Sequence, residues 1–236
     1  MDKLLQPVPL LMAILIAGFV ACLPLYQWNI KKFITSSLGI KVLMWIPLYM
    51  FFVFVASQGV MAAVLAAGVI GLFASVEFFR QHDFTKSWWY FVYFMVALAG
   101  WIGSVAAISR PELWMTLTLS SVFSDVIAFF MGNYMGKHHL PQVINPRKSY
   151  EGAAGQIIGG ILGAILFGSL FGVEIPLWVG GIIGAASLVG DLLNSVAKRL
   201  LNIKDWGNTI PGHGGMMDRF SSLNLALCLM WLLYAL

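Results

Sequence analysis

The stretch GDLLNSVAKRLLNIKDWGNTIPGHGGMMDRFSS, residues 190–222, is a polar segment within a very hydrophobic chain. Its first part has helical spacing, because Asp191, Ser195 and Lys198 are four and three residues apart and share one face. Several glycines and Pro211 follow Asn202 and predict a loop whose open backbone can approach phosphate oxygens. Carboxylates that suit a metal ion and cations that suit phosphate accompany this loop. The stretch therefore indicates nucleotide or phosphoryl chemistry at a membrane face.

The composition predicts an all-α fold, a polytopic helical membrane protein. The chain has 236 residues, of which 60% are hydrophobic and 10% charged, and its mean hydropathy is +0.86. A soluble domain has about 25% charged residues. The net charge of +4 does not indicate nucleic-acid binding, because the cations lie in short loops between apolar runs. Cys22 and Cys228 lie in apolar runs and are expected to be buried thiols, neither a disulfide nor a metal pair.

Apolar runs long enough to cross a bilayer predict about eight transmembrane helices. The first run is expected to be a span and not a cleavable signal peptide. We expect one integral domain, in which residues 1–112 form N-terminal spans and residues 113–236 a catalytic region with two cytoplasmic loops. The loops are the central loop, residues 132–152, and the signature loop, residues 196–220. The expected spans are residues 7–26, 41–56, 60–79, 88–108, 113–131, 153–171, 175–195 and 223–236.

The distribution of cations fixes the expected orientation. With the signature loop in the cytoplasm, only Lys3 and Arg110 of the 14 lysines and arginines fall outside, as the positive-inside rule favours. The other cations then share the cytoplasmic side: Lys31, Lys32, Lys41, Arg80, Lys86, Lys137, Arg147, Lys148, Lys198, Arg199, Lys204 and Arg219. Glycine-rich faces in the sixth and seventh spans predict close helix packing and would permit a homodimer.

Two carboxylates are expected inside spans, those of Asp125 and Asp191, and Asp218 precedes the last span. A carboxylate in a membrane helix is costly and is usually functional or paired. Carboxylates that converge from different spans suit Mg²⁺, so these three form a candidate metal site. The alternative is a structural hydrogen bond or ion pair within the bundle. For Glu77, an ion pair with Arg80 one turn later is the preferred interpretation.

Several residues of the polar stretch occur at fixed spacing: Ser195, Lys198, Arg199, Lys204, Asp205, Gly207, Pro211, His213, Gly214, Gly215, Asp218 and Arg219. This pattern resembles the signature of the CDP-diacylglycerol synthases, also called phosphatidate cytidylyltransferases. One departure is Ser221, where the family usually has Asp. The central loop resembles a second region of that family through Asp125, Ala128, Phe129, Gly136, Lys137 and residues 145–152.

The resemblance implies transfer of a cytidylyl group from CTP to phosphatidic acid, giving CDP-diacylglycerol and pyrophosphate, at the cytoplasmic face of the inner membrane. It implies Mg²⁺ on Asp191 and Asp218, completed by Asp125, and a second, monovalent cation such as K⁺. The expected catalytic residues are Asp191, Lys198, Asp205, His213, Asp218 and Arg219. The expected substrate-binding residues are Lys137, Arg147, Lys148, Ser149, Glu151, Ser195, Arg199, Lys204, Gly214 and Gly215.

Two alternatives remain open. One is a CTP-dependent nucleotidyltransferase that acts on another lipid phosphate, because no residue reports the lipid's chain chemistry. The other is a non-catalytic membrane homologue, which Ser221 alone favours. His138 and His139 are expected to be solvated, and Trp88, Trp89 and Tyr90 to form an aromatic belt at the interface.

Overall fold

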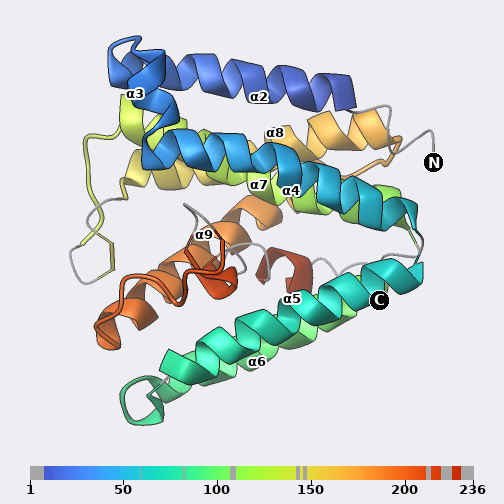
Figure 1. Cartoon of the computed structure of the whole chain (residues 1–236), viewed down its shortest axis with the longest axis vertical. Coiled ribbons are helices and arrows are strands. Elements are labelled where there is room, and N and C mark those ends of the chain that lie inside the picture. Colours follow the sequence, from blue (N-terminus) through green and yellow to red (C-terminus); the bar gives the residue numbers. More distant parts are fainter. Residues whose placement is uncertain are drawn as a thin grey trace.

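The computed structural model describes residues 8–58, 60–81, 83–106, 110–141, 144–145, 148–210, 214–218 and 225–229. These residues are nearly all helical, and their only β features are two isolated bridges (Figure 1). The elements are α2 (Val8–Cys22), the 3₁₀ helix η1 (Leu23–Tyr26), α3 (Ile30–Ile34), α4 (Ser37–Ser57), α5 (Val60–Gln81), α6 (Phe84–Ala106), α7 (Pro111–Tyr134), α8 (Tyr150–Phe171) and α9 (Leu177–Leu200).

The helices follow the predicted apolar runs, so a helical membrane protein is the fold class. Within the described residues, four helices are long and apolar enough to cross a membrane; they lie in α5, α7, α8 and α9. Shorter apolar stretches occupy α2, α4 and α6. The predicted count of about eight spans is therefore not confirmed. Most of the eighth run lies outside the described residues, although residues 225–229 are helical.

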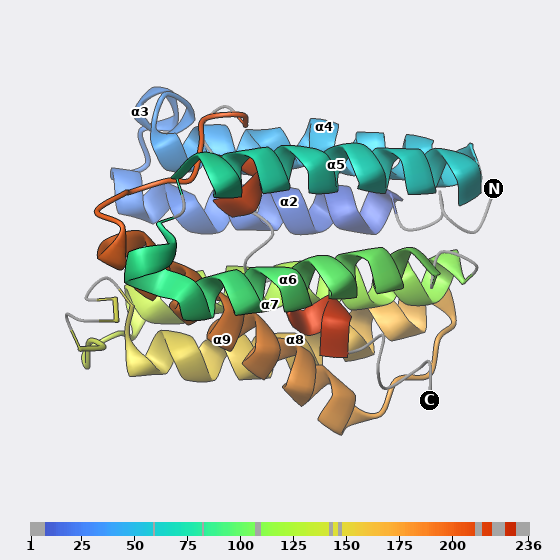
Figure 2. The ribbon, with the colours of Figure 1, turned by 90° about the horizontal axis from the view of Figure 1, so that it is seen from below.

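The helix ends lie at two opposite ends of the bundle. Figure 2 shows α3, the junction of α5 with α6, the central loop and the start of the signature loop at one end. The opposite end holds the junctions of α4 with α5, of α6 with α7 and of α8 with α9. The two loops predicted to share one side therefore lie at the same end of the bundle.

Glycines bring α7, α8 and α9 into close contact, as predicted. A Cβ on Gly160 would meet the Gly180 carbonyl oxygen at 2.4 Å and the Gly184 nitrogen at 2.6 Å, so α8 and α9 pack backbone to backbone. On another face of α8, a Cβ on Gly163 would lie 2.8 Å from the Cα of Ser120 in α7. Because these faces are filled within the chain, they give no support to a homodimer.

Aromatic side chains form much of the core where α5, α6 and α9 meet. The Phe78 ring stacks on Phe94 with centroids 4.0 Å apart, and Tyr90 stacks on Trp206 at 5.5 Å. Tyr90 is fully buried, whereas Trp88 is 69% exposed. The prediction of an aromatic belt is therefore wrong for Tyr90. Residues two positions apart lie on different faces of a helix, so Trp88 can be exposed while Tyr90 faces the core. Cys22 and Cys228 are buried free thiols, as expected.

Candidate active site

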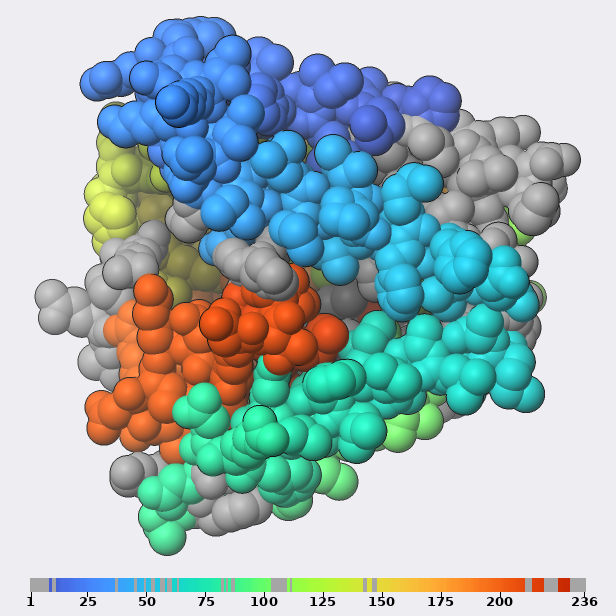
Figure 3. Space-filling view, viewed as in Figure 1, coloured from blue at the N-terminus to red at the C-terminus, as the bar shows by residue number. Residues whose placement is uncertain are grey.

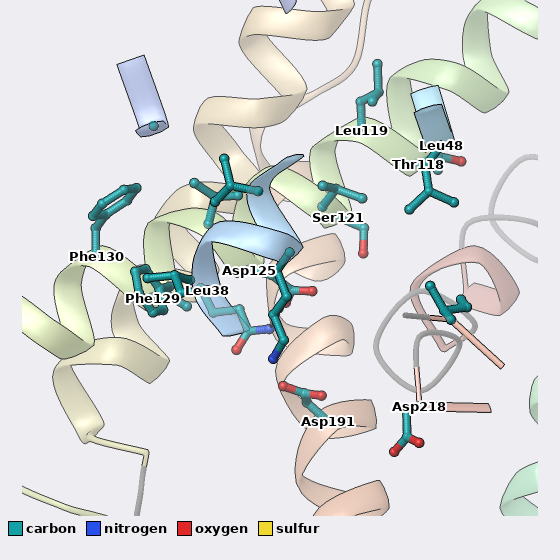
Figure 4. A pocket seen from close by; sticks show the side chains of 18 of the residues that line it. Leu38, Leu48, Thr118, Leu119, Ser121, Asp125, Phe129, Phe130, Asp191 and Asp218 are labelled. Carbon is teal, nitrogen blue, oxygen red and sulfur yellow. Dashed lines mark hydrogen bonds between the residues drawn. The ribbon is translucent and has the colours of Figure 1, made fainter. Parts of the chain in front are cut away.

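A cavity of about 850 Å³ lies among α2, α4, α5, α7, α8, α9 and the signature loop. Its walls from α2, α4, α5 and α7 are mainly apolar, and its polar lining includes Lys148 and Gln156. Figure 4 shows the carboxylates of Asp125, Asp191 and Asp218 around this space. On the face drawn in Figure 3, the orange residues of the signature loop lie between the blue helices and the blue-green pair α5 and α6. The cavity thus joins apolar walls to charged groups from separate elements.

Asp218 is held by two backbone N–H groups and one lysine. Its Oδ2 accepts hydrogen bonds from the backbone N–H groups of Trp206 (2.8 Å) and Gly215 (3.0 Å). Its Oδ1 accepts from the Lys198 ammonium at 2.7 Å, and the Asp218 side chain is only 1% exposed. The last turns of α9 supply Lys198, so a buried ion pair joins the end of this helix to Asp218, 20 positions later in the chain.

Asp191 lies two turns earlier on α9 and joins that helix to the central loop. The Lys148 ammonium lies 2.5 Å from Asp191 Oδ2, and the two side chains are 27% and 34% exposed. Close by, the Asn145 amide donates to the Ser195 hydroxyl at 3.1 Å. The structure therefore brings residues 43 and 50 positions apart into one polar wall.

Asp125 projects from α7 and accepts a hydrogen bond from the buried Gln156 amide of α8 at 2.5 Å. Within the described residues, no three His, Cys, Asp or Glu side chains converge closely enough to hold a metal ion. Asp191 and Asp218 instead hold one lysine ammonium each. The three carboxylates border one cavity, and Asp191 and Asp218 are each paired with a lysine.

Two residues predicted to bind substrate have local structural roles. The Ser149 hydroxyl is buried and accepts from the Gly152 N–H at 3.1 Å, which makes Ser149 the N-cap of α8. The Glu151 carboxylate lies 2.6 Å from Nδ1 of His138. His138 is 77% exposed, as expected of a solvated histidine, and it is also bonded to Glu151. Sequence reasoning missed this contact because it spans 13 residues.

Replacing Ser149 with alanine should separate these roles. Loss of an N-cap costs about 1 kcal/mol, which lowers the thermal midpoint of a chain this long by roughly 2–4 °C. If the cap is the whole role, KM values for substrates should stay unchanged. Thermal unfolding and steady-state kinetics of the purified variant test this, with Ser149→Asp, which can still cap, as control. A large KM increase in both variants would restore the substrate-binding interpretation.

Most of the other predicted residues are exposed charged side chains or glycines. Lys137, Arg199, Lys204 and Asp205 are exposed. Gly214 has φ +79°, a backbone conformation that side chains disfavour, and a Cβ there would meet Asp218 Oδ2 at 3.2 Å and Asp205 Oδ1 at 3.3 Å. Asp205 and Asp218 therefore flank the same turn. The remaining predicted residues, Arg147, His213 and Arg219, lie outside the described residues, as does Ser221.

The cytidylyltransferase family model matches residues 4–236, which is nearly the whole chain. The chain belongs to the cytidylyltransferase family. Curated relatives include the phosphatidate cytidylyltransferase of Mycobacterium bovis, 35% identical over 124 residues, with 51% of this chain and 40% of the relative covered. The phosphatidate cytidylyltransferase of Bacillus subtilis is 36% identical over 117 residues, with 48% and 44% covered. These alignments thus span less than half the length of the relatives.

Two buried polar residues of this cytidylyltransferase-family chain have partners that the sequence analysis did not predict. The Asn194 amide oxygen accepts from the Tyr90 hydroxyl (2.8 Å) and from the Trp206 indole N–H (2.7 Å). Glu77, expected to pair with Arg80, is instead buried against the signature loop, whereas Arg80 is exposed. The Glu77 expectation is wrong because helical spacing shows only partners on the same helix. An acid at the end of an apolar run was the available signal.

Proposed function

We propose that the protein transfers a cytidylyl group from CTP to phosphatidic acid, giving CDP-diacylglycerol and pyrophosphate. The observation that carries the proposal is the cavity, in which apolar walls from α2, α4, α5 and α7 meet Asp125, Lys148, Asp191 and Asp218. Acyl chains suit the apolar part, and phosphates suit the charged part. Family membership and the names of the relatives support the same reaction.

In this reaction, an oxygen of the lipid phosphate attacks the α-phosphorus of CTP in line and pyrophosphate leaves. The phosphate is already a nucleophile, so the protein needs to position the reactants and neutralise their charge. Lys198 and Lys148 each pair with one of the carboxylates, and each can turn from its acid towards a phosphate oxygen. Arg219 would stabilise the charge that develops on pyrophosphate. Exposed Lys137 and Lys204 would contribute at the rim.

Mg²⁺ belongs to the same proposal, because three carboxylates border one cavity and oxygen ligands are those that Mg²⁺ prefers. The three side chains would have to move closer together to hold it. Asp191 and Asp218 would hold the ion, with Asp125 completing the site. The lysine ammonium groups on two of these acids mark positions where the protein favours positive charge. When bound, Mg²⁺ would neutralise the triphosphate. A second, monovalent cation such as K⁺ belongs to the same proposal.

The direct test is CTP turnover by the purified protein in phosphatidic-acid vesicles, with and without Mg²⁺. Formation of labelled CDP-diacylglycerol that depends on both is expected. Turnover only with other lipid phosphates from a membrane extract would favour the related nucleotidyltransferase. Absence of turnover with every lipid phosphate would leave the non-catalytic homologue.

We further propose that the site faces the cytoplasm from the inner membrane. Support comes from the cation distribution and from the position of both loops at one end of the bundle. Residues 1–112 and 113–236 would act as one integral domain, because α5 and α6 pack on α9 and the signature loop. The glycine faces are filled within the chain, so a homodimer is not included.

Cysteine labelling in intact cells and in inverted vesicles tests this orientation. Lys137→Cys and Lys204→Cys place single exposed thiols in the two loops, and Glu174→Cys places one between α8 and α9. We expect the first two to react only in inverted vesicles and the third only in intact cells. The buried native thiols of Cys22 and Cys228 give the background. Opposite accessibility of the two loops would contradict a shared site.

A further inference from the structure

Glu77 is a buried carboxylate to which the proposed chemistry assigns no role. It lies one turn before the end of α5, and it is 6% exposed. A carboxylate at such a place needs strong hydrogen bonds, because burial of an unsatisfied charge is very costly. Within the described residues, the hydrogen-bond partners of Glu77 belong to the signature loop, more than 130 residues away in the sequence.

Both carboxylate oxygens bind that loop. Oε2 accepts from the backbone N–H of Met217 at 2.9 Å, and Oε1 accepts from the Thr209 hydroxyl. The backbone closes around the same group at Gly207 and Gly215, where an added Cβ would overlap the Glu77 carboxylate. Two glycines of the loop therefore leave the space that this acid fills.

Two further residues on the same face of α5 bind the loop at Trp206. The Gln81 amide donates to the Trp206 carbonyl oxygen at 2.8 Å. The Phe78 ring stacks on the Trp206 indole with centroids 5.5 Å apart. Glu77, Phe78 and Gln81 are spaced so that all three reach one side of the helix. The end of α5 thus binds the loop at Trp206 and again at Met217.

The backbone that α5 holds is also the backbone that holds Asp218. The N–H groups of Trp206 and Gly215 donate to Asp218 Oδ2, and Met217 is its chain neighbour. A shift of this backbone would move the carboxylate relative to Lys198 and the cavity. We propose that Glu77 is a positioning residue, which fixes the signature loop so that Asp218 faces the nucleotide and metal site. This inference rests on the proposed function.

Glu77→Ala tests the proposal, with Glu77→Gln as the conservative variant. The glutamine oxygen can accept from Met217 and its amide can donate to Thr209, so Glu77→Gln should retain at least half of wild-type activity. For Glu77→Ala we expect a KM for CTP at least about fivefold higher and a similarly increased Mg²⁺ requirement, with the KM for phosphatidic acid unchanged. Loss of stability alone would reduce the active fraction but leave these KM values unchanged.

A second readout does not depend on activity. Trypsin cleavage after the exposed Lys204 reports opening of the loop, because a protease needs a locally unfolded site. Cleavage should be several-fold faster in Glu77→Ala and close to wild type in Glu77→Gln. Thr209→Val removes the loop side of the same contact at an exposed position, so it keeps the test available if Glu77→Ala does not fold. It should accelerate cleavage in the same direction. Glu174→Gln, an exposed acid at the opposite end, should change neither readout.

Unchanged cleavage in Glu77→Ala and Thr209→Val would overturn the proposal, as would equal acceleration in Glu77→Gln and Glu77→Ala. If the wild-type protein does not turn over CTP, the proposed function fails, while cleavage still decides whether Glu77 fixes the loop. Accelerated cleavage with unchanged KM values in an active protein would reduce Glu77 to a structural residue.

Discussion

Replacement of Asp191 with asparagine should lower cytidylyl transfer about 10²–10³-fold, because removal of one charged ligand takes away both charge and geometry. The fold should survive the change. Asp191 is 34% exposed and its Lys148 partner 27%, so both groups stay in contact with water when the pair is broken. Such exposed pairs contribute only about 0.2–1 kcal/mol to stability.

The measurement is turnover at saturating CTP and lipid over a range of Mg²⁺ concentrations, together with the thermal midpoint. Glu112→Gln is the matched control and should leave turnover unchanged, because Glu112 lies in the first turn of α7, at the end of the bundle away from the two loops. Near-normal activity of Asp191→Asn at saturating Mg²⁺ would remove Asp191 from the set of metal ligands.

Replacement of Lys198 with methionine should have a second large effect, on stability and turnover together. The Lys198 ammonium lies 2.7 Å from Oδ1 of Asp218, whose side chain is 1% exposed. Removing one member of a buried pair leaves the other charge uncompensated and costs about 3–5 kcal/mol. We therefore expect a thermal midpoint lower by roughly 6 °C or more and strongly reduced turnover.

Comparison of Lys198→Met with Lys148→Met shows how much of the loss of stability is due to burial of the carboxylate. Lys148→Met removes the same kind of cation from a carboxylate that water still reaches, so it should reduce turnover but leave the thermal midpoint nearly unchanged. The double variant Lys198→Met/Asp218→Asn should recover part of the stability lost in Lys198→Met, because no buried charge is left unpaired. Equal thermal midpoints for Lys198→Met and Lys148→Met would contradict the exposure argument.

Hydropathy predicted the helices well because a membrane span is specified by about 20 consecutive residues. The runs at residues 60–79 and 153–171 differ from α5 and α8 by three residues or fewer at each end. The signature pattern likewise pointed to Asp191 and Asp218, both of which border the cavity. Information of this kind is contained within one stretch of sequence.

Pairings between distant segments could not be predicted in the same way. Glu77 reaches Met217 across 140 positions, and no local spacing indicates such a contact. Trp206 is 1% exposed and stacks on Tyr90 and Phe78, two residues more than 110 positions earlier in the sequence. Aromatic content alone does not distinguish a ring that faces lipid from one that fills a core.

The apolar walls that α2, α4, α5 and α7 give the cavity have a kinetic consequence. A lipid whose acyl chains occupy these walls would reach the protein by diffusion within the bilayer plane, since its chains strongly prefer the membrane. The rate would then follow the surface fraction of phosphatidic acid, and not its amount per volume. Dilution of the vesicles with buffer should leave turnover unchanged, whereas dilution of phosphatidic acid with an inert phospholipid should slow it.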